Sequence, residues 1–291
     1  MPSQVTRIFS TVTLSTRVFA RSPSDRRRRI TSLDFQEIGR VIARSPSVAG
    51  YIRTLNCQLH PSDFENGDVS DILRKFNDLQ SLTIKAHKHL REPSAVTGDE
   101  DQVKLMDYGL EQCTRSLHDA LTRLVHLPTL MSLKLGHLLN LPIEVLAKAI
   151  GLHTLNIHRC QFTGAPPFHS SSNIAPSSFQ LRTLKLYPDS SLNVDTLKNW
   201  SPQVMDSSKI QQVAFKFRAQ DDRQQLEDLL NGMFSLETLT LEYTHWPPFN
   251  EPIMRAPDFR TLDNLHHLVI RCELLDGLKL QSEICSIVHI S

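Results

Sequence analysis

The residues best suited to metal chemistry lie in one short stretch, which contains His153, His158 and Cys160. Imidazole and thiolate groups are preferred ligands of Zn²⁺. Side chains of a strand alternate between two faces, and a strand over 152–157 would point His158 outward. Cys160 lies beyond that strand and should turn inward, so the two groups are not expected to converge. We therefore expect no metal site, and we expect Cys160 to be a buried structural thiol that bonds the loop backbone.

Other chemical signatures are absent from the sequence. The phosphate-binding patterns G-x-x-x-x-G-K-[S/T] and G-x-G-x-x-G do not occur, nor does a G-x-S-x-G nucleophile elbow. The zinc patterns H-E-x-x-H and C-x-x-C are missing as well. We therefore expect no cofactor and rank an enzyme as the weakest hypothesis, although a site assembled only in three dimensions stays open.

A phrase of the form L-x-x-L-x-[L/I] recurs along the chain and is its strongest pattern. Neighbouring copies start 22–29 residues apart, except for one gap of 51 residues that is close to two periods. This period is typical of leucine-rich-repeat solenoids. We therefore predict an α/β fold, a leucine-rich-repeat solenoid with a curved parallel sheet on the concave side and helices and irregular turns on the convex side. The copies begin at Ile52, Leu79, Leu130, Leu152, Leu181, Ile210, Leu236 and Leu265.

The alternation within each copy separates an inner layer from a binding face. Positions four and six are apolar in nearly every copy and should point inward, whereas positions three, five and seven should point outward onto the concave sheet. The outward set carries five cations and one acid, so we expect it to bind an acidic segment of a protein partner. The alternative is that these lysines keep an exposed sheet soluble. The candidate partner-binding residues are Lys85, Lys134, His158, Lys185, Tyr187, Lys216, Glu242 and Arg271.

Composition limits the partners further. A net charge of +1 over 291 residues provides no global field toward nucleic acid or membrane, so neither partner is expected. No apolar run approaches the length of a membrane span. The five cysteines are sparse and odd in number, which favours reduced thiols in the cytoplasm or nucleus.

The expected organisation is a basic N-terminal segment, 1–29, followed by a solenoid over 30–291. The first segment has seven arginines and one acidic residue, which fits a mitochondrial transit peptide. The alternative is an ordered edge strand near 8–14, followed by a basic loop that could instead act as a nuclear-import patch. A helix is expected over 30–44, capped by Thr31-x-x-Asp34. Flexible insertions are expected near 91–107 and 163–179.

Three phrases of the chain resemble the leucine-rich F-box proteins of mushroom-forming fungi. They are RIFSTVTL at 7–14, IARSPSVAGYIRTL at 42–55 and LTRLVHLPTLMSLKL at 121–135. The resemblance covers nearly the whole chain and implies a substrate receptor of a cullin–RING ubiquitin ligase, in which the F-box binds the ligase adaptor and the repeats hold the substrate.

The chain departs from that family at the F-box, because only six residues precede Arg7. LPIEVL at 141–146 resembles the opening of an F-box, but it lies where the short helix of a repeat belongs. We therefore expect substrate recognition and do not expect recruitment of the ligase adaptor. A standalone repeat scaffold and a truncated gene product are the alternatives. The apolar end, 283–291, is expected to be an uncapped last strand, which would leave an edge for association.

Overall fold

The computed structural model describes residues 10–15, 32–59, 63, 67–86, 115–138, 141–142, 144–158, 160, 162–163, 180–187, 206–217, 222–243, 262–276 and 279–289. Within these residues the chain is an α/β protein with a parallel sheet and few helices. It divides into two compact units. Unit 1 comprises 1–130 and 135–141, and unit 2 comprises 131–134 and 142–291.

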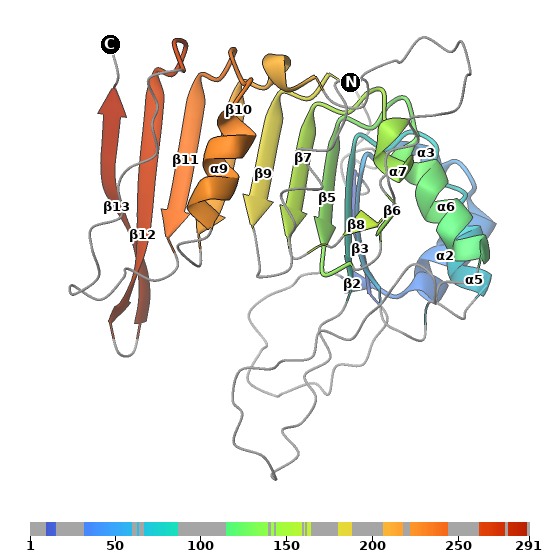
Figure 1. Cartoon of the computed structure of the whole chain (residues 1–291). Coiled ribbons are helices and arrows are strands. Elements are labelled where there is room, and N and C mark those ends of the chain that lie inside the picture. The colour runs from blue at the N-terminus through green and yellow to red at the C-terminus, as the bar shows by residue number, and fades with distance from the viewer. Residues whose placement is uncertain are drawn as a thin grey trace, which may run out of the picture. The chain divides into compact units, whose positions relative to one another are not determined.

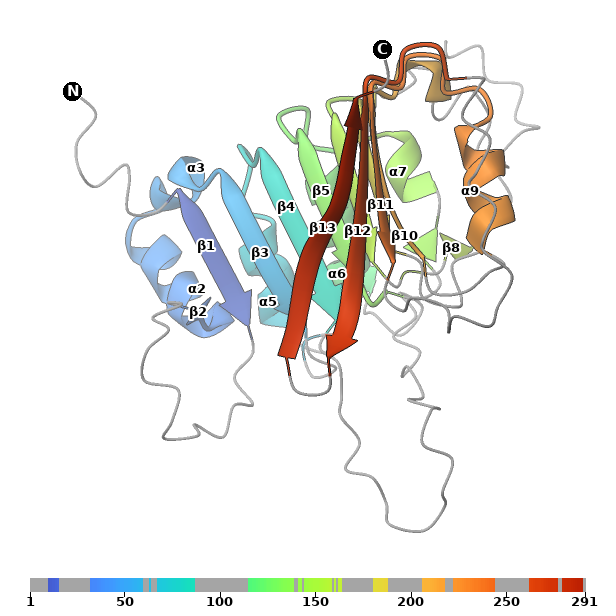
Figure 2. The same cartoon turned by 90° about the vertical axis from the view of Figure 1, so that its left-hand side faces the viewer.

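Unit 1 contains a parallel sheet with strand order β4-β3-β1-β2. Its helices lie together on one face of this sheet (Figure 2). None of the helices described in the chain is long and apolar enough to cross a membrane. The elements of unit 1 are β1 (Thr11–Ser15), β2 (Ser32–Leu33), α2 (Phe35–Arg44), α3 (Val48–Tyr51), β3 (Thr54–Leu59), α5 (Gly67–Leu73), β4 (Ser81–Ala86) and α6 (Arg115–Val125).

Unit 2 contains the strand order β13-β12-β11-β10-β9-β7-β5, which follows the chain (Figure 1). Helix α9 covers one face of the sheet over β10 (Figure 1). The elements are β5 (Ser132–Gly136, of which the first three residues belong to unit 2), β6 (Leu141–Pro142, at the boundary), α7 (Glu144–Ala147), β7 (Thr154–His158), β8 (Phe162–Thr163), β9 (Thr183–Tyr187), η2 (Ser207–Lys209), β10 (Gln212–Phe217), α9 (Asp222–Leu230), β11 (Thr238–Tyr243), β12 (His267–Asp276) and β13 (Lys279–His289).

The predicted alternation of the strands is confirmed. Buried and half-buried side chains alternate along β3, β4, β7 and β9, and positions four and six of each phrase form the buried set. Leu184 and Leu186 of β9, for example, are fully buried. The exception is Ile270, at the sixth position of the last phrase, which is half-buried.

Most consecutive copies are joined by hydrogen bonds to the backbone carbonyl at the same position of the phrase. The residue at the second position of a phrase accepts hydrogen bonds from two N–H groups of the next copy, as when His153 O accepts from Arg182 N at 2.9 Å and Thr183 N at 3.0 Å. Ser10 O accepts in the same manner from Arg53 N and Thr54 N. Strand β1 is therefore a further copy of the repeat, which precedes the first one found by pattern.

The N-terminal segment was interpreted either as a transit peptide or as an ordered strand, and residues 10–15 allow a choice between the two. Val12 and Leu14 of β1 pair with Leu55 and Cys57 of β3, and both are buried. An ordered strand is thus confirmed for Thr11–Ser15, but it is not at the edge of the sheet, because β1 pairs with β2 as well as with β3. The basic run at 26–29 lies outside the described residues.

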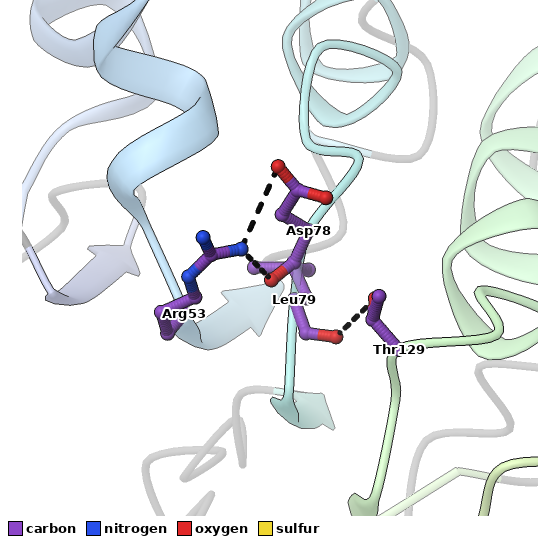
Figure 3. Close-up of polar contacts among 4 residues, drawn as sticks. All are labelled: Arg53, Asp78, Leu79 and Thr129. Atoms are coloured by element: carbon purple, nitrogen blue, oxygen red, sulfur yellow. Dashed lines mark hydrogen bonds and ion pairs between the residues drawn. The ribbon is translucent and has the colours of Figure 1, made fainter.

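Side chains reinforce the turns that precede the strands of unit 1 (Figure 3). Arg53 Nη1 donates to the carbonyl oxygen of Asp78 at 2.9 Å and lies 3.5 Å from its carboxylate. Thr129 Oγ1 donates to Leu79 O at 2.8 Å. The ion pair is about half exposed and contributes little by itself. The hydrogen bonds occupy two successive carbonyls ahead of β4, so they hold the starts of neighbouring repeats together.

The first helix starts later than predicted. Residues 32–33 form β2, and α2 begins at Phe35 with Asp34 as its N-cap. Asp34 Oδ1 accepts from Gln36 N and Glu37 N, while Glu37 Oε2 accepts from Asp34 N at 3.3 Å. The prediction that Thr31-x-x-Asp34 caps the helix was wrong, because Asp34-x-x-Glu37 forms the capping box three residues further on.

The later helices agree with their apolar spacing. Leu117, Leu121 and Leu124 form the buried stripe of α6, and LPIEVL leads into the four-residue helix α7 rather than a larger helical module. Helix α9 is followed by Gly232 at φ +93°, a conformation that favours glycine. The insertion predicted at 91–107 lies outside the described residues, as does the one at 163–179 apart from Thr163 in β8.

The last strand departs from the parallel pattern. β13 forms an antiparallel pair with β12 and stands at the edge of the sheet order. The strand expected near 283–291 is therefore present, and it begins earlier, at Lys279. It follows β12 through a connection of two residues, a length that suits a hairpin and is too short for a parallel crossover.

Candidate functional site

The candidate site is the sheet face of unit 2 that carries the third, fifth and seventh positions of the phrases, here called the open face. Side chains at these positions of β7, β9, β10, β11 and β12 are half-buried or exposed, as predicted. Helix α9 covers one face of the sheet over β10 (Figure 1), and the fourth and sixth positions of these strands, except Ile270, are buried. The open face is therefore accessible over consecutive strands.

The strand register arranges these side chains in rows. In the fifth-position row, Asn156 pairs with Lys185, Lys185 with Ala214, and Ala214 with Thr240. Lys134 of β5 occupies the same position of its phrase. Met131 O accepts from His153 N and Thr154 N, the second and third positions of the β7 phrase, which is the bond pattern that links β7 to β9. The fifth-position row thus contains two lysines, with Asn156 between them.

The seventh-position row is more varied in chemistry. His158 pairs with Tyr187, Lys216 with Glu242, and Glu242 with Arg271. Arg271 Nη1 lies 3.0 Å from Glu242 Oε1, and the Glu242 side chain is only 17% exposed. The charge of Arg271 is therefore offset within the protein. Lys134, Lys185 and Lys216 are the other cations of the open face in unit 2, and Lys216 lies opposite the same Glu242 in the register.

Tyr187 stands in the middle of the seventh-position row. Its ring lies 5.7 Å from that of His158, in a tilted arrangement. Burial raises the pKa of the Tyr187 phenol, Glu242 raises this pKa further, and Arg271 opposes the shift. The hydroxyl therefore remains protonated at neutral pH and is available as a hydrogen-bond donor beside Lys185.

Replacement of Glu242 by glutamine should lower the pKa of Tyr187, because the carboxylate that disfavours the phenolate is removed. Spectrophotometric titration of phenolate absorbance would measure the shift. Subtraction of the matching curve for Tyr187→Phe assigns the signal among the four tyrosines of the chain. An unchanged or higher Tyr187 pKa in Glu242→Gln would contradict the proximity of these two groups.

Lys85, the remaining candidate, lies in unit 1. A Cβ atom placed on Gly136 would meet Lys85 Cγ at 3.0 Å, so the aliphatic part of Lys85 lies over this glycine. Gly136 was expected to point outward, yet it is buried. The glycine leaves room for the lysine stem, a packing effect that column-by-column reading of the sequence does not reveal.

Cys160 and His158 make different contacts in the structure. Cys160 is fully buried, and its Sγ donates to the carbonyl oxygen of His158 at 3.5 Å, as predicted for a structural thiol. The His158 ring instead contacts Tyr187 on the open face. Among the described residues, no three His, Cys, Asp or Glu side chains gather to hold a metal ion.

Cys57 is also structural in character. It is fully buried on β3, and burial, with a smaller effect of Asp63, raises the pKa of its thiol to about 12. A protonated and inaccessible thiol is a poor nucleophile. Both cysteines whose side chains are described are free of disulfides and buried.

Two residues of the open face were not singled out from the sequence. Asn156 carries a buried Oδ1 atom with no hydrogen-bond partner among the described residues. Ala214 is the smallest side chain in its row and lies between Lys185 and Thr240. The signal for Ala214 was present in the repeat alignment as a small residue in a column of longer side chains.

Two comparisons with known proteins find no relative of this chain. A scan against protein-family models gives no match, and a search of the curated proteins finds no significant match.

Proposed function

We propose that the chain is a non-catalytic, protein-binding module, a leucine-rich-repeat solenoid that holds its partner on the open face. One observation carries the proposal: outward side chains of consecutive strands line up in accessible rows, while the positions between them are buried. The carbonyl that bridges most consecutive copies supports the repeat assignment. A rigid row of this kind positions contacts for an extended partner without further ordering of the protein.

The partner proposed is a protein segment that carries acidic residues. Lys134, Lys185 and Lys216 supply positive charge to the open face, whereas the acidic Glu242 is bound to Arg271. Complementary charge mainly increases the rate and specificity of association. The net charge of +1 makes nucleic acid and membrane surfaces weaker candidates.

The resemblance to leucine-rich F-box proteins supports the proposal that this module is the substrate-recognition part of a ubiquitin-ligase receptor. The proposal covers recognition alone, and adaptor binding, which belongs to the F-box, is not included. Free thiols at Cys57 and Cys160 favour the cytoplasm or nucleus. Strand β1, with two buried side chains, supports Thr11–Ser15 as part of the fold rather than as part of a mitochondrial signal.

A pull-down with purified ligase adaptor distinguishes a module that only recognises substrate from a complete receptor, which also binds the adaptor. We expect the 291-residue chain to leave the adaptor in the unbound fraction. Adaptor retention at the level of an intact F-box receptor would contradict a recognition-only module. A standalone repeat scaffold would also leave the adaptor unbound, so the partners recovered by affinity capture decide between these two.

The double variant Lys134→Glu/Lys185→Glu should lower recovery of the natural partner by about tenfold or more, because both charges of one row then repel an acidic segment. Affinity capture with quantitative mass spectrometry measures this recovery. The matched control is Lys148→Glu/Arg182→Glu, which makes the same charge change at exposed positions outside the open face. Equal recovery with the two double variants would remove the open face as the binding site.

A further inference from the structure

The turns that lead into β5, β7, β9, β10, β11 and β12 form one edge of the sheet in unit 2, here called the start rim, at the top of Figure 1. Backbone hydrogen bonds join these turns in order. Met131 O accepts from His153 N and His153 O accepts from Arg182 N, each at 2.9 Å. The same bond recurs at every later step, as far as Glu237 O and His266 N. The start rim is therefore a fixed series of columns, one for each strand and about 4.8 Å apart.

Large apolar side chains are exposed on the start rim. Met131 leads into β5 and is 45% exposed, Ile150 precedes β7 and is 53% exposed, and Phe234 precedes β11 and is 65% exposed. They are the large apolar residues of unit 2 that are exposed within the described part of the chain. The turn at Phe234 is held by Asn264, whose Nδ2 donates to Phe234 O at 2.6 Å. Exposed apolar groups gathered on one edge indicate a surface that another protein covers.

Charge divides the start rim into two halves. The columns of β7 and β9 carry the exposed cations Lys148 and Arg182. The columns of β11 and β12 carry the exposed anions Glu237 and Asp263. None of these four side chains forms an ion pair with another described residue. Their charges are therefore available to a second molecule.

The other charged groups of the start rim are compensated within the protein. In the turn before β10, Lys209 Nζ lies 3.4 Å from Asp206 Oδ2. Glu237 Oε1 accepts a hydrogen bond from Gln211 Nε2 at 3.2 Å, but this donor is neutral and leaves the negative charge of Glu237 in place. Among its described residues, the start rim is thus positive at its β7 half and negative at its β12 half.

We propose that the start rim binds the start rim of a second copy of this chain in a symmetric dimer. A twofold axis between the columns of β9 and β10 places the β7 column of each copy against the β11 column of the other. Lys148 then faces Glu237 of the second copy, and Ile150 faces Phe234 of the second copy. The alternative, in which equal columns face each other, would oppose like charges and is disfavoured.

This symmetry leaves the proposed binding surface free. The twofold axis runs along the normal of the sheet, because it reverses both the order of the columns and the direction of the strands. Both open faces therefore lie on the same side of the dimer and stay uncovered. The contact extends over six columns, or about 24 Å, which makes a small interface. We therefore expect reversible association, with a Kd on the order of 10 µM.

Sedimentation velocity over a concentration series measures dimerisation of the full chain. Lys148→Glu/Arg182→Glu and Glu237→Lys/Asp263→Lys should each weaken the dimer by about tenfold or more, because the two halves of the rim then repel each other. An equimolar mixture of these two variants should dimerise again, since one start rim is then negative in both halves and the other is positive in both halves.

Two further variants complete the test. Ile150→Asp should weaken the dimer by about tenfold or more, because it places a charge in the apolar contact. Arg40→Glu/Lys75→Glu makes the first charge change at exposed positions of unit 1 and should dimerise as the wild type does. Thermal unfolding of each variant verifies that it is folded.

Three results would each overturn the dimer: a wild-type chain that stays monomeric over the whole series, a charge-reversed variant that dimerises like the wild type, or a mixture that stays monomeric. The proposed function is tested separately, because Lys148 and Arg182 lie outside the open face. A monomeric chain that still loses its partner when Lys134 and Lys185 are reversed would uphold the open face as the binding site and reject the dimer.

Discussion

Leu184→Ala should lower the free energy of unfolding by about 2–5 kcal/mol. Leu184 is fully buried in the middle of β9 and is paired with Leu155 on β7 and Val213 on β10. Both neighbours are buried as well. Truncation at this site would remove contacts with two adjacent strands and leave a cavity that the sheet backbone can only partly close.

Chemical denaturation of wild type and variant measures this loss. The matched control is Lys185→Ala, one residue along the same strand and on the open face, which should change stability by no more than about 0.5 kcal/mol. Similar losses for the two variants would mean that the strand register is shifted. A one-residue slip exchanges the two faces of a strand, so this pair tests the assignment of every open-face residue on β9.

Leu14→Ala should have an effect of the same order, about 2–5 kcal/mol. Leu14 is fully buried on β1 and lies between Cys57 of β3 and Leu33 of β2 in the register. The residue belongs to a segment whose composition also suits a transit peptide. A large loss would place β1 in the folded core, as the structure has it.

The control for this second experiment is Thr11→Ala, at an exposed position of the same short strand. Denaturation curves for the two variants should separate clearly, with Thr11→Ala close to wild type. If Leu14→Ala unfolds at the same denaturant concentration as wild type, β1 contributes nothing to the core, and the chain would start its folded sheet at β3.

Both predictions concern the inward positions, and the binding proposals concern the outward ones. A period of two residues separates these roles along every strand. Variants at Lys134 or Lys185 are therefore expected to change partner binding while leaving stability nearly unchanged, since half-exposed charges on a sheet contribute little to folding. The reverse is expected for Leu184.

The sequence by itself determined the parts of this protein that depend on local chemistry. Alternation of apolar residues identified the strands and assigned the buried face, because a strand places successive side chains on opposite sides. The repeat interval identified the order of the copies, and the apolar steps of three and four identified α6. The position of Cys160, two residues past the end of β7, was sufficient to predict a buried thiol that bonds the backbone.

The tertiary structure decided what depends on neighbours that are distant in sequence. β1 is identified as a further copy of the repeat because Arg53 N and Thr54 N donate to Ser10 O, although the phrase of β1 lacks the leading leucine. The charge of Arg271 was offset by Glu242 on an adjacent strand, and Gly136 was buried by the stem of Lys85. Each outcome follows from register between strands, which brings together side chains about 4.8 Å apart whose spacing in the chain is tens of residues. A single strand specifies which face a side chain occupies, and only the assembled sheet specifies its neighbours there.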